Sequence, residues 1–266
     1  MLSSIFRRRR PIRIGYALGG GAVRGAAHLG ALAVFREAGI EPDFIAGTSA
    51  GAIVGAGYAA GVPLEDMSRQ IRTASRQDIA TLAWRRRGLS VLDTTPLSLW
   101  IEHAIGDVDF AELSIPLAVV ACNVIDGREV VLREGSVVRA AVASSAIPGL
   151  FTPVEDGPLL LVDGGMVNNL PVNVARAMGA DVVIAVDVNP VGPLTHRPSN
   201  LLDMVTASLE IAAGVTQRAS REAANVLVQP DVARFSLWDF ANAEEIELAG
   251  RRAAEEALDA IHHALE

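Results

Sequence analysis

The most constraining feature of the sequence is a serine between two glycines at residues 47–51, which read Gly-Thr-Ser-Ala-Gly. Apolar residues that favour a strand lead into this stretch, and small and apolar residues typical of a helix follow it. This is the pattern of a strand that turns sharply into a helix with a serine hydroxyl at the apex. Gly47 and Gly51 suit such a turn, because a Cβ at either place would clash with the neighbouring strand or helix. Ser49 is therefore a candidate nucleophile, and the N–H groups that begin the next helix help to stabilise an oxyanion.

Two other interpretations of this stretch stay open. The motif fixes few positions, so a chain rich in alanine and glycine can contain it by chance. Residues 44–62 also carry no charge and place Gly47, Gly51 and Gly55 at the spacing of paired membrane helices. That length is barely sufficient to cross a bilayer, and its polar residues interrupt the apolar surface. We therefore expect a buried turn rather than a membrane span.

The charge balance and the absence of lysine exclude several functions. The chain of 266 residues has a formal net charge of −8, so it lacks the overall positive field that a nucleic-acid partner requires. All 23 basic residues are arginine, which excludes a Walker-type phosphate loop and Schiff-base chemistry. The single cysteine, Cys122, lies in an apolar run. We expect it to be a buried thiol in a reducing, cytoplasmic compartment.

Residues 1–11 form a separate basic segment that contains Arg7 to Arg10. A secretory signal places its charges before a long apolar stretch, so this order predicts no export signal. We expect a disordered, solvated tail, and contact with anionic lipid at the membrane periphery is the alternative. Residues 12–266 contain no repeat, no low-complexity linker and no clear boundary, and they are expected to form a single domain.

The hydrophobic pattern predicts strands and helices in alternation. Strands are expected at residues 12–18, 44–48, 116–124, 129–132, 159–162, 180–188 and 226–228, and helices at residues 26–38, from 63 onward, 137–145, 171–178, 201–220 and 243–265. This alternation predicts an α/β fold, a three-layer sandwich with a mainly parallel central sheet. Residues 69–105 are polar and rich in arginine, and one interpretation makes them a cap over a binding cleft.

A glycine-rich turn at residues 19–25, Gly-Gly-Gly-Ala-Val-Arg-Gly, is the second candidate site. It is similar to a dinucleotide fingerprint, with Glu41 or Asp43 near the place of a ribose-binding acid. The spacing departs from that fingerprint, however. Consecutive small residues also let backbone N–H groups converge on an anion, which in an acyl-transfer enzyme is the tetrahedral oxygen. A tight structural turn without a ligand is the third interpretation.

A serine nucleophile needs a proton acceptor within hydrogen-bond reach. The histidines of the chain are His28, His103, His196, His262 and His263. Only His196 follows the order serine, acid, histidine in a loop after a strand, which would make a conventional triad. Asp163 is the better candidate, because it ends a short apolar strand before two glycines, where strand ends line the ligand crevice. A turn aspartate that caps its own backbone is the structural alternative.

Four stretches together resemble the patatin-like phospholipase family, and in size the chain is similar to its compact bacterial members. Residues 17–30 are similar to the family's oxyanion block, and residues 47–51 match its nucleophile motif, including the threonine. Residues 143–151 are similar to a further block, and residues 163–165 to the aspartate motif. The resemblance covers about residues 12–190. Each motif is weak alone, but four in the right order are specific.

The resemblance implies a Ser-Asp dyad without histidine, in which Ser49 attacks an ester carbonyl and Asp163 takes its proton. It also implies an oxyanion hole of backbone amides in a loop that an arginine supports, at Gly20, Gly21, Ala22 and Arg24. Ala22 stands where some members carry another glycine, which leaves the choice of amide donors open.

These features predict a serine acyl hydrolase that cleaves phospholipids or related lipid esters, of the phospholipase A or lysophospholipase type. The expected partner is a lipid or acyl-ester substrate, with peripheral contact to a membrane as an alternative location. No metal or cofactor is expected, and the sequence assigns no oligomeric state. The main rival is a regulatory or scaffold protein that keeps the fold with incidental esterase activity, although intact Ser49 and Asp163 argue against it. A nucleotide-binding oxidoreductase is a more distant alternative.

Overall fold

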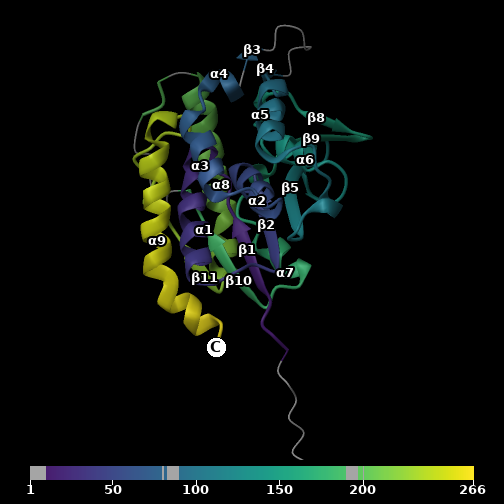
Figure 1. The fold of residues 1–266 in the computed structure, drawn as a ribbon. Helices are drawn as coiled ribbons and strands as arrows, with labels where there is room; N and C mark the ends of the chain where they lie inside the picture. The colour runs from purple at the N-terminus through teal and green to yellow at the C-terminus, as the bar shows by residue number, and fades with distance from the viewer. Residues whose placement is uncertain (1–9, 80, 83–89, 190–196, 200) are drawn as a thin grey trace, which may run out of the picture.

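The computed structural model describes residues 10–79, 81–82, 90–189, 197–199 and 201–266. Its central strands are β1 (Ile14–Leu18), β2 (Phe44–Thr48), β5 (Leu117–Asn123), β6 (Arg128–Leu132), β8 (Val154–Asp156), β9 (Leu159–Asp163), β10 (Val182–Val186) and β11 (Val226–Val228). They form one eight-stranded sheet in the order β11-β10-β1-β2-β5-β9-β8, with β6 also paired to β5 (Figure 1).

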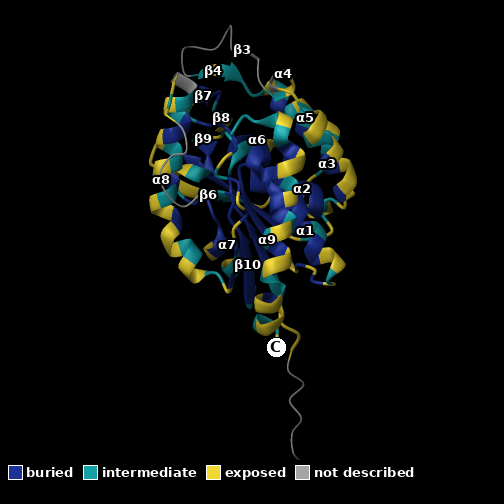
Figure 2. Ribbon diagram, turned by 90° about the vertical axis from the view of Figure 1, so that its left-hand side faces the viewer, coloured by how far each residue is buried: buried dark blue, intermediate teal, exposed yellow. Residues whose placement is uncertain are grey.

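Helices cover both faces of this sheet. They are α1 (Ala26–Glu37), α2 (Ala50–Ala59), α3 (Leu64–Thr73), α4 (Arg76–Ile79), α5 (Thr95–Ile105), α6 (Val137–Ser144), α7 (Val172–Met178), α8 (Leu201–Ala223) and α9 (Ala243–Ala264). Figure 2 shows α7 and α8 on one side of the buried sheet, and α1, α2 and α3 on the other. The predicted α/β class with three layers and a mainly parallel sheet is confirmed.

Five neighbouring strands, β11, β10, β1, β2 and β5, run parallel. Parallel strands covered on both faces are apolar throughout, and β5 and β10 are buried at every residue, Cys122 of β5 included. Alternate side chains of β1 pack on opposite sides of the sheet. Tyr16 and Leu18 join the core under α1, α2 and α9, whereas Ala17 packs with residues of α7. The sheet therefore lies between two apolar layers, which fix its position.

The strand β5 brings the ends of two other strands together. β2 pairs in parallel with residues 117–120 of β5, and β9 pairs antiparallel with residues 121–123. β6 pairs along both of these segments, so it occupies one edge of β5 and leaves β2 and β9 to share the other. β2 ends at Thr48 and β9 ends at Asp163, opposite neighbouring residues of β5. The carboxyl ends of β2 and β9 therefore meet, which places Asp163 beside the turn that follows Thr48.

The structure adds a small second sheet that the sequence did not predict. Its strands are β3 (Thr81–Leu82), β4 (Ser90–Asp93) and β7 (Gly149–Phe151), in the order β3-β4-β7. β4 pairs in parallel with β7, which lies far along the chain. A local pattern cannot indicate such a pairing, because neither strand is long enough to show alternation on its own.

The two sequence interpretations that concern membranes have different outcomes. Residues 44–62 do not form one apolar helix, because they fold into β2, a turn and the ten-residue α2. Within the described ranges, no helix combines the length and the hydropathy that a membrane span requires. Residues 1–9 of the predicted basic tail lie outside the described part of the chain, so the tail stays a prediction.

The helices α1 and α9 lie side by side and approach closely at two glycines, Gly30 and Gly250 (Figure 1). A Cβ built on Gly250 would lie 1.8 Å from the carbonyl oxygen of Ala27, which is far inside van der Waals contact. We expect Gly250→Ala to lower the free energy of unfolding by about 1–3 kcal/mol, because it forces the two helices apart. Thermal unfolding followed by circular dichroism measures this as a lower Tm.

Gly214 of α8 provides the matched control, because a Cβ there would meet no atom within 4 Å. Alanine is favoured over glycine in a helix by about 1 kcal/mol, so Gly214→Ala should melt at the wild-type temperature or above it. Identical melting of Gly250→Ala and the wild type would contradict the close approach of α1 and α9.

Candidate active site

Ser49 occupies the sharp turn between β2 and α2. Its backbone has φ 51° and ψ −120°, a conformation that costs a residue with a side chain about 1–3 kcal/mol. The turn also needs Gly51, since a Cβ there would lie 2.1 Å from the carbonyl oxygen of Leu18. The Ser49 N–H donates to Ser144 Oγ at 2.7 Å, and that hydroxyl donates to the Val120 carbonyl oxygen at 2.5 Å. The strained turn is thus held from the side by α6 and β5.

Asp163, the last residue of β9, receives the hydroxyl of Ser49. Ser49 Oγ donates to Asp163 Oδ2 at 2.9 Å, and both residues are buried, with 9% and 8% of their surface exposed. The other carboxylate oxygen, Oδ1, accepts the Gly165 N–H at 2.8 Å. The Asp163 N–H donates to the Ala146 carbonyl oxygen at 2.9 Å. The carboxylate is therefore oriented by backbone contacts on both sides, with one oxygen left for the serine.

Burial raises the pKa of Asp163 to about 6, and the hydrogen bonds from Gly165 and Ser49 lower it only in part. A buried carboxylate loses the hydration that stabilises its charge, so its neutral form is favoured. A pKa close to neutral suits a group that must take up a proton and release it again.

Hydrogen bonds hold the first three carbonyl groups of the glycine loop, residues 19–25, which lies next to Ser49. His28 Nε2 donates to the Gly19 carbonyl oxygen at 2.8 Å. Burial lowers the pKa of His28 to about 4, so this ring is neutral. The Gly20 carbonyl oxygen accepts two side-chain amides, and the Gly21 carbonyl oxygen accepts the Arg24 N–H at 3.1 Å. The loop is therefore rigid before any ligand arrives.

The N–H groups of the same loop divide into two kinds. The Gly20 N–H donates to the Asn169 carbonyl oxygen at 3.1 Å, so it is already occupied. The N–H groups of Gly21 and Ala22 have no hydrogen-bond partner among the residues that the structure describes. Ala22 has φ 49°, the left-handed conformation that glycine adopts more easily. Of the three amides that the resemblance suggested, only those of Gly21 and Ala22 are available.

Arg24 ties the loop to distant parts of the chain. Its side chain is almost fully buried, with Nε donating to the Phe235 carbonyl oxygen at 2.8 Å and a terminal nitrogen 2.5 Å from Glu210 Oε1 of α8. The guanidinium therefore points toward α8 and not toward Ser49. Arg24 therefore anchors the loop to α8 and to the segment that contains Phe235.

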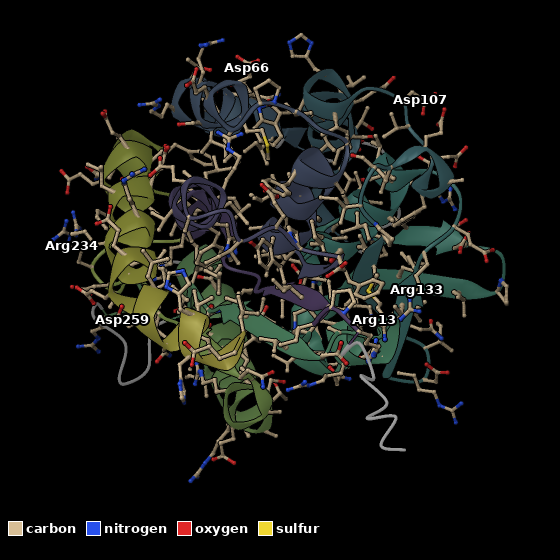
Figure 3. All side chains as sticks on the ribbon, turned by 60° about the horizontal axis from the view of Figure 1, so that its bottom comes forward. Arg13, Asp66, Asp107, Arg133, Arg234 and Asp259 are labelled. Carbon is tan, nitrogen blue, oxygen red and sulfur yellow. The ribbon has the colours of Figure 1, made fainter. Side chains whose placement is uncertain are left out.

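Buried charge concentrates around this site. Figure 3 shows charged side chains at the periphery of the molecule, and its labelled examples on the exposed surface are Asp66, Asp107, Arg133, Arg234 and Asp259. Within the described ranges, the buried Asp, Glu and Arg residues are Arg24, Asp163 and Asp187. Charges are seldom buried without partners, and each of these three is hydrogen-bonded in or beside the site.

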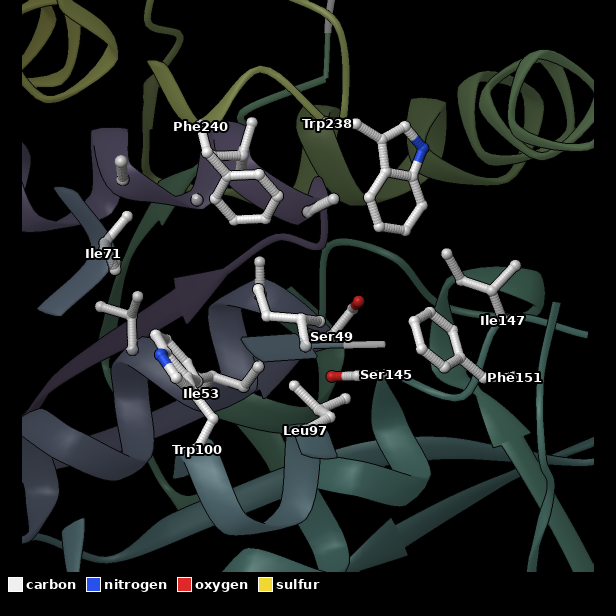
Figure 4. Close-up of a pocket in the computed structure, with 17 residues that line it drawn as sticks. Ser49, Ile53, Ile71, Leu97, Trp100, Ser145, Ile147, Phe151, Trp238 and Phe240 are labelled. Carbon is white, nitrogen blue, oxygen red and sulfur yellow. The ribbon is translucent and has the colours of Figure 1, made fainter. Parts of the chain in front are cut away.

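An apolar pocket opens beside Ser49 (Figure 4). The rings of Trp100, Phe151, Trp238 and Phe240 surround it, and Figure 4 shows them placed around the serine. Trp100 comes from the segment 69–105, which the sequence analysis interpreted as a cap, and this segment does supply part of the pocket wall. The aromatic lining drawn from such distant segments had no signal in the sequence.

A second, more polar pocket lies on the other side of Ser49. It is lined by Asp163, Asn169, Asn189 and Glu210, together with the glycine loop. Ser49 lines both pockets, so this residue lies between them. No pattern in the sequence indicated Asn169 and Asn189, which contact the loop from the segment before α7 and from the segment after β10.

No histidine of the described part of the chain hydrogen-bonds Ser49. His28 is buried against the glycine loop, whereas the side chains of His103, His262 and His263 are exposed. His196, the triad candidate, lies outside the described residues. The dinucleotide interpretation finds no support in the acids, because Glu41 and Asp43 precede β2 and so lie at the opposite end of the strand from Ser49.

Metal ligands are not gathered in the described ranges, where no group of three or more His, Cys, Asp or Glu side chains is placed to hold an ion.

Comparison with known proteins shows which family the chain belongs to. The family model described as patatin-like phospholipase matches residues 16–176. An uncharacterised NTE family protein of Mycobacterium tuberculosis is 30% identical over 282 residues, which cover 93% of this chain and 46% of that protein. Patatin-like phospholipase domain-containing protein 6 of Homo sapiens is 34% identical over 192 residues, covering 66% of this chain and 13% of that protein.

The chain thus spans about half the length of the mycobacterial relative. The crystal structure of VipD from Legionella pneumophila is similar in fold, with a TM-score of 0.63 at 13% identity, covering 94% of this chain and 67% of that one. The matched residues 16–176 contain Ser49, Asp163 and the glycine loop. The chain belongs to the patatin-like phospholipase family.

Proposed function

We propose that this protein is a serine hydrolase that cleaves the ester bonds of phospholipids or related lipids through Ser49 and Asp163. The observation that carries the proposal is the 2.9 Å hydrogen bond from Ser49 Oγ to a buried carboxylate of raised pKa. A nucleophile within hydrogen-bond reach of an oriented base is the arrangement that acyl transfer requires. Family membership and the apolar pocket beside the serine agree with a lipid ester as substrate.

In the proposed reaction, Asp163 takes the proton of Ser49 as the serine oxygen attacks the ester carbonyl carbon. The carbonyl oxygen becomes an oxyanion, which the N–H groups of Gly21 and Ala22 bind, with the first turn of α2 adding a favourable dipole. When the tetrahedral intermediate collapses, the carbon–oxygen bond to the alcohol breaks and Asp163 returns the proton to that alcohol. Water then attacks the acyl-serine by the same steps and releases the fatty acid.

The different linings of the two pockets suggest how the substrate is oriented at Ser49. The acyl chain is proposed to enter the apolar pocket, because aromatic and aliphatic walls favour a hydrocarbon over water. The alcohol then leaves through the polar pocket beside Asp163, where the proton is returned. Whether the enzyme is a phospholipase A or a lysophospholipase depends on how this second pocket accepts the alcohol. A scaffold protein with incidental esterase activity is the rival proposal.

The dyad is tested by hydrolysis of p-nitrophenyl esters of short and medium chain length. We expect Ser49→Ala to lose at least about a thousandfold in kcat, because the nucleophile is removed. Asp163→Asn should lose about 10²- to 10⁴-fold, the usual contribution of a general base. His196→Ala should stay active.

Two exposed residues serve as controls, Ser208 on the outer face of α8 and Asp259 on α9. Ser208→Ala and Asp259→Asn should keep wild-type rates. Loss of activity in His196→Ala would favour a conventional triad with His196 over the Ser49–Asp163 dyad. If the wild type hydrolysed neither these esters nor phospholipid vesicles, the result would contradict the enzyme proposal and favour a scaffold protein.

The raised pKa of Asp163 sets the expected pH dependence of the reaction. Below about pH 6 the carboxyl group is protonated and cannot accept the Ser49 proton. We expect kcat/KM for a p-nitrophenyl ester, with the product quantified by chromatography, to fall about tenfold per pH unit below this value and to level off above it. A triad histidine would titrate in the same range. The profile should therefore persist in His196→Ala, and a rate independent of pH down to 4.5 would contradict the role of Asp163.

The same pKa shift predicts a stability effect. Burial raises the pKa of Asp163 in the folded protein to about 6, above the ordinary aspartate value of 3.8, so the folded protein binds this proton more tightly than the unfolded chain. Stability is therefore lost as pH rises from 3.8 to about 6, and the loss is constant at higher pH. We expect Asp163→Asn to raise Tm at pH 8 and to have a much smaller effect at pH 4, as scanning calorimetry would show. An equal shift at both pH values would contradict the buried charge as the cause.

A further inference from the structure

Two side-chain amides converge on one carbonyl group in the glycine loop. Asn169 Nδ2 donates to the Gly20 carbonyl oxygen at 3.2 Å, and Asn189 Nδ2 donates to the same oxygen at 2.6 Å. Asn169 precedes α7 and Asn189 follows β10, so the two donors come from different parts of the sheet edge. Both residues also line the polar pocket beside Ser49. Such a doubly held carbonyl fixes the plane of its peptide group.

The peptide that begins with the Gly20 carbonyl ends with the Gly21 N–H. Within the described ranges all peptide bonds are trans, so this N–H points away from the oxygen that the two asparagines hold. Among the same residues the N–H has no partner, although Gly20 and Gly21 line the pocket that contains Ser49. A Cβ built on Gly20 would lie 3.0 Å from the Cβ of Ser49, which shows how close the loop is to the nucleophile.

We propose that Asn169 and Asn189 are positioning residues that aim the Gly21 N–H at the oxyanion and polarise it. This inference rests on the proposed function, since it concerns the transition state of that reaction. Hydrogen bonds donated to a peptide oxygen draw electron density toward it, which strengthens the same peptide group as a donor at its nitrogen. The effect is largest when a full negative charge develops opposite the N–H, as it does on the substrate oxygen.

The two asparagines are themselves held in place. Asn189 donates its backbone N–H to Asp187 Oδ1 at 3.0 Å, and Asp187 Oδ2 accepts Arg221 Nε of α8 at 2.6 Å. The carboxyl group of Asp187 is fully buried. Asn169 contacts the loop twice, since its carbonyl oxygen also accepts the Gly20 N–H. The donors that fix the Gly20 carbonyl are thus parts of a rigid network, as a positioning role requires.

The experiment uses Asn189→Asp and Asn169→Asp in the full chain. Each substitution keeps the size of the side chain but replaces the N–H donor with a carboxylate oxygen that repels the Gly20 carbonyl. We expect kcat for a p-nitrophenyl ester to fall about ten- to a hundredfold in each variant, because one oxyanion donor is misaligned. KM should stay within about twofold.

A second readout separates this role from a purely structural one. A trifluoromethyl ketone adds to the serine and carries an oxyanion, so it imitates the transition state. Its inhibition constant should rise in each variant by the same factor as kcat/KM falls. Asn173→Asp is the matched control, because this exposed residue lies in the first turn of α7, where a carboxylate is well tolerated.

The outcomes distinguish the two proposals. This inference would be overturned if folded Asn189→Asp and Asn169→Asp kept the wild-type kcat and inhibition constant. If Ser49→Ala were inactive in the same assays, the proposed function would stay intact. Ser49→Ala with wild-type activity would overturn the proposed function and with it this inference. If circular dichroism shows that the aspartate variants are unfolded, Asn189→Ala and Asn169→Ala carry the same test, because they remove the donor without adding charge. An increase in KM alone would assign the asparagines to substrate binding and overturn the positioning role.

Discussion

The site depends on a constraint in the sheet, the single edge of β5 along which β2 and β9 end against each other. β2 arrives parallel to β5 and β9 arrives antiparallel, so the last residue of each strand reaches the same point. A shift of one residue in the pairing of β9 would turn Asp163 to the opposite face of the sheet. Thr48 Oγ1 also donates to the Asn168 carbonyl oxygen at 2.8 Å, which links the end of β2 to the chain that follows Asp163. The Ser49–Asp163 hydrogen bond is therefore a product of strand register.

Backbone strain is concentrated where this register is used. Ser49 and Ala22 are the non-glycine residues with positive φ in the described part of the chain, and they face the same pockets. Such conformations persist only where the surroundings determine them, and here hydrogen bonds from neighbouring elements hold both segments. Ser144 holds the Ser49 N–H, and His28 and the asparagines hold the glycine loop. The fold thus stabilises a geometry that the isolated segments would not adopt.

Much of the fold and the two central residues of the site could be predicted from the sequence, because both depend on local patterns. Ser49 and Asp163 each follow a short apolar strand and are flanked by glycines, and the alternation of strands and helices indicates the layers. The rest depends on contacts between distant segments. Asn189 reaches Gly20 across 169 positions of sequence, and no local pattern indicates that contact.

The glycine loop illustrates the same limit at the level of single atoms. Three small residues in a row predict free amides, but the sequence does not reveal that the Gly20 N–H is occupied by the Asn169 carbonyl oxygen. The aromatic pocket was missed for a related reason, since Trp100 and Trp238 come from segments without a clear periodic pattern. Sequence motifs identify the candidate reacting groups, whereas tertiary packing determines which groups orient them.

The ion pairs of α8 hold this helix against the candidate site. Glu210 of this helix pairs with the buried Arg24 of the glycine loop, and Arg221 pairs with the buried Asp187. Separating one partner of a buried pair costs about 3–5 kcal/mol, so an outward swing of α8 would break both pairs and expose the loop. These contacts hold the helix as a wall of the site. In the proposed reaction, a substrate would therefore have to enter without an outward swing of α8.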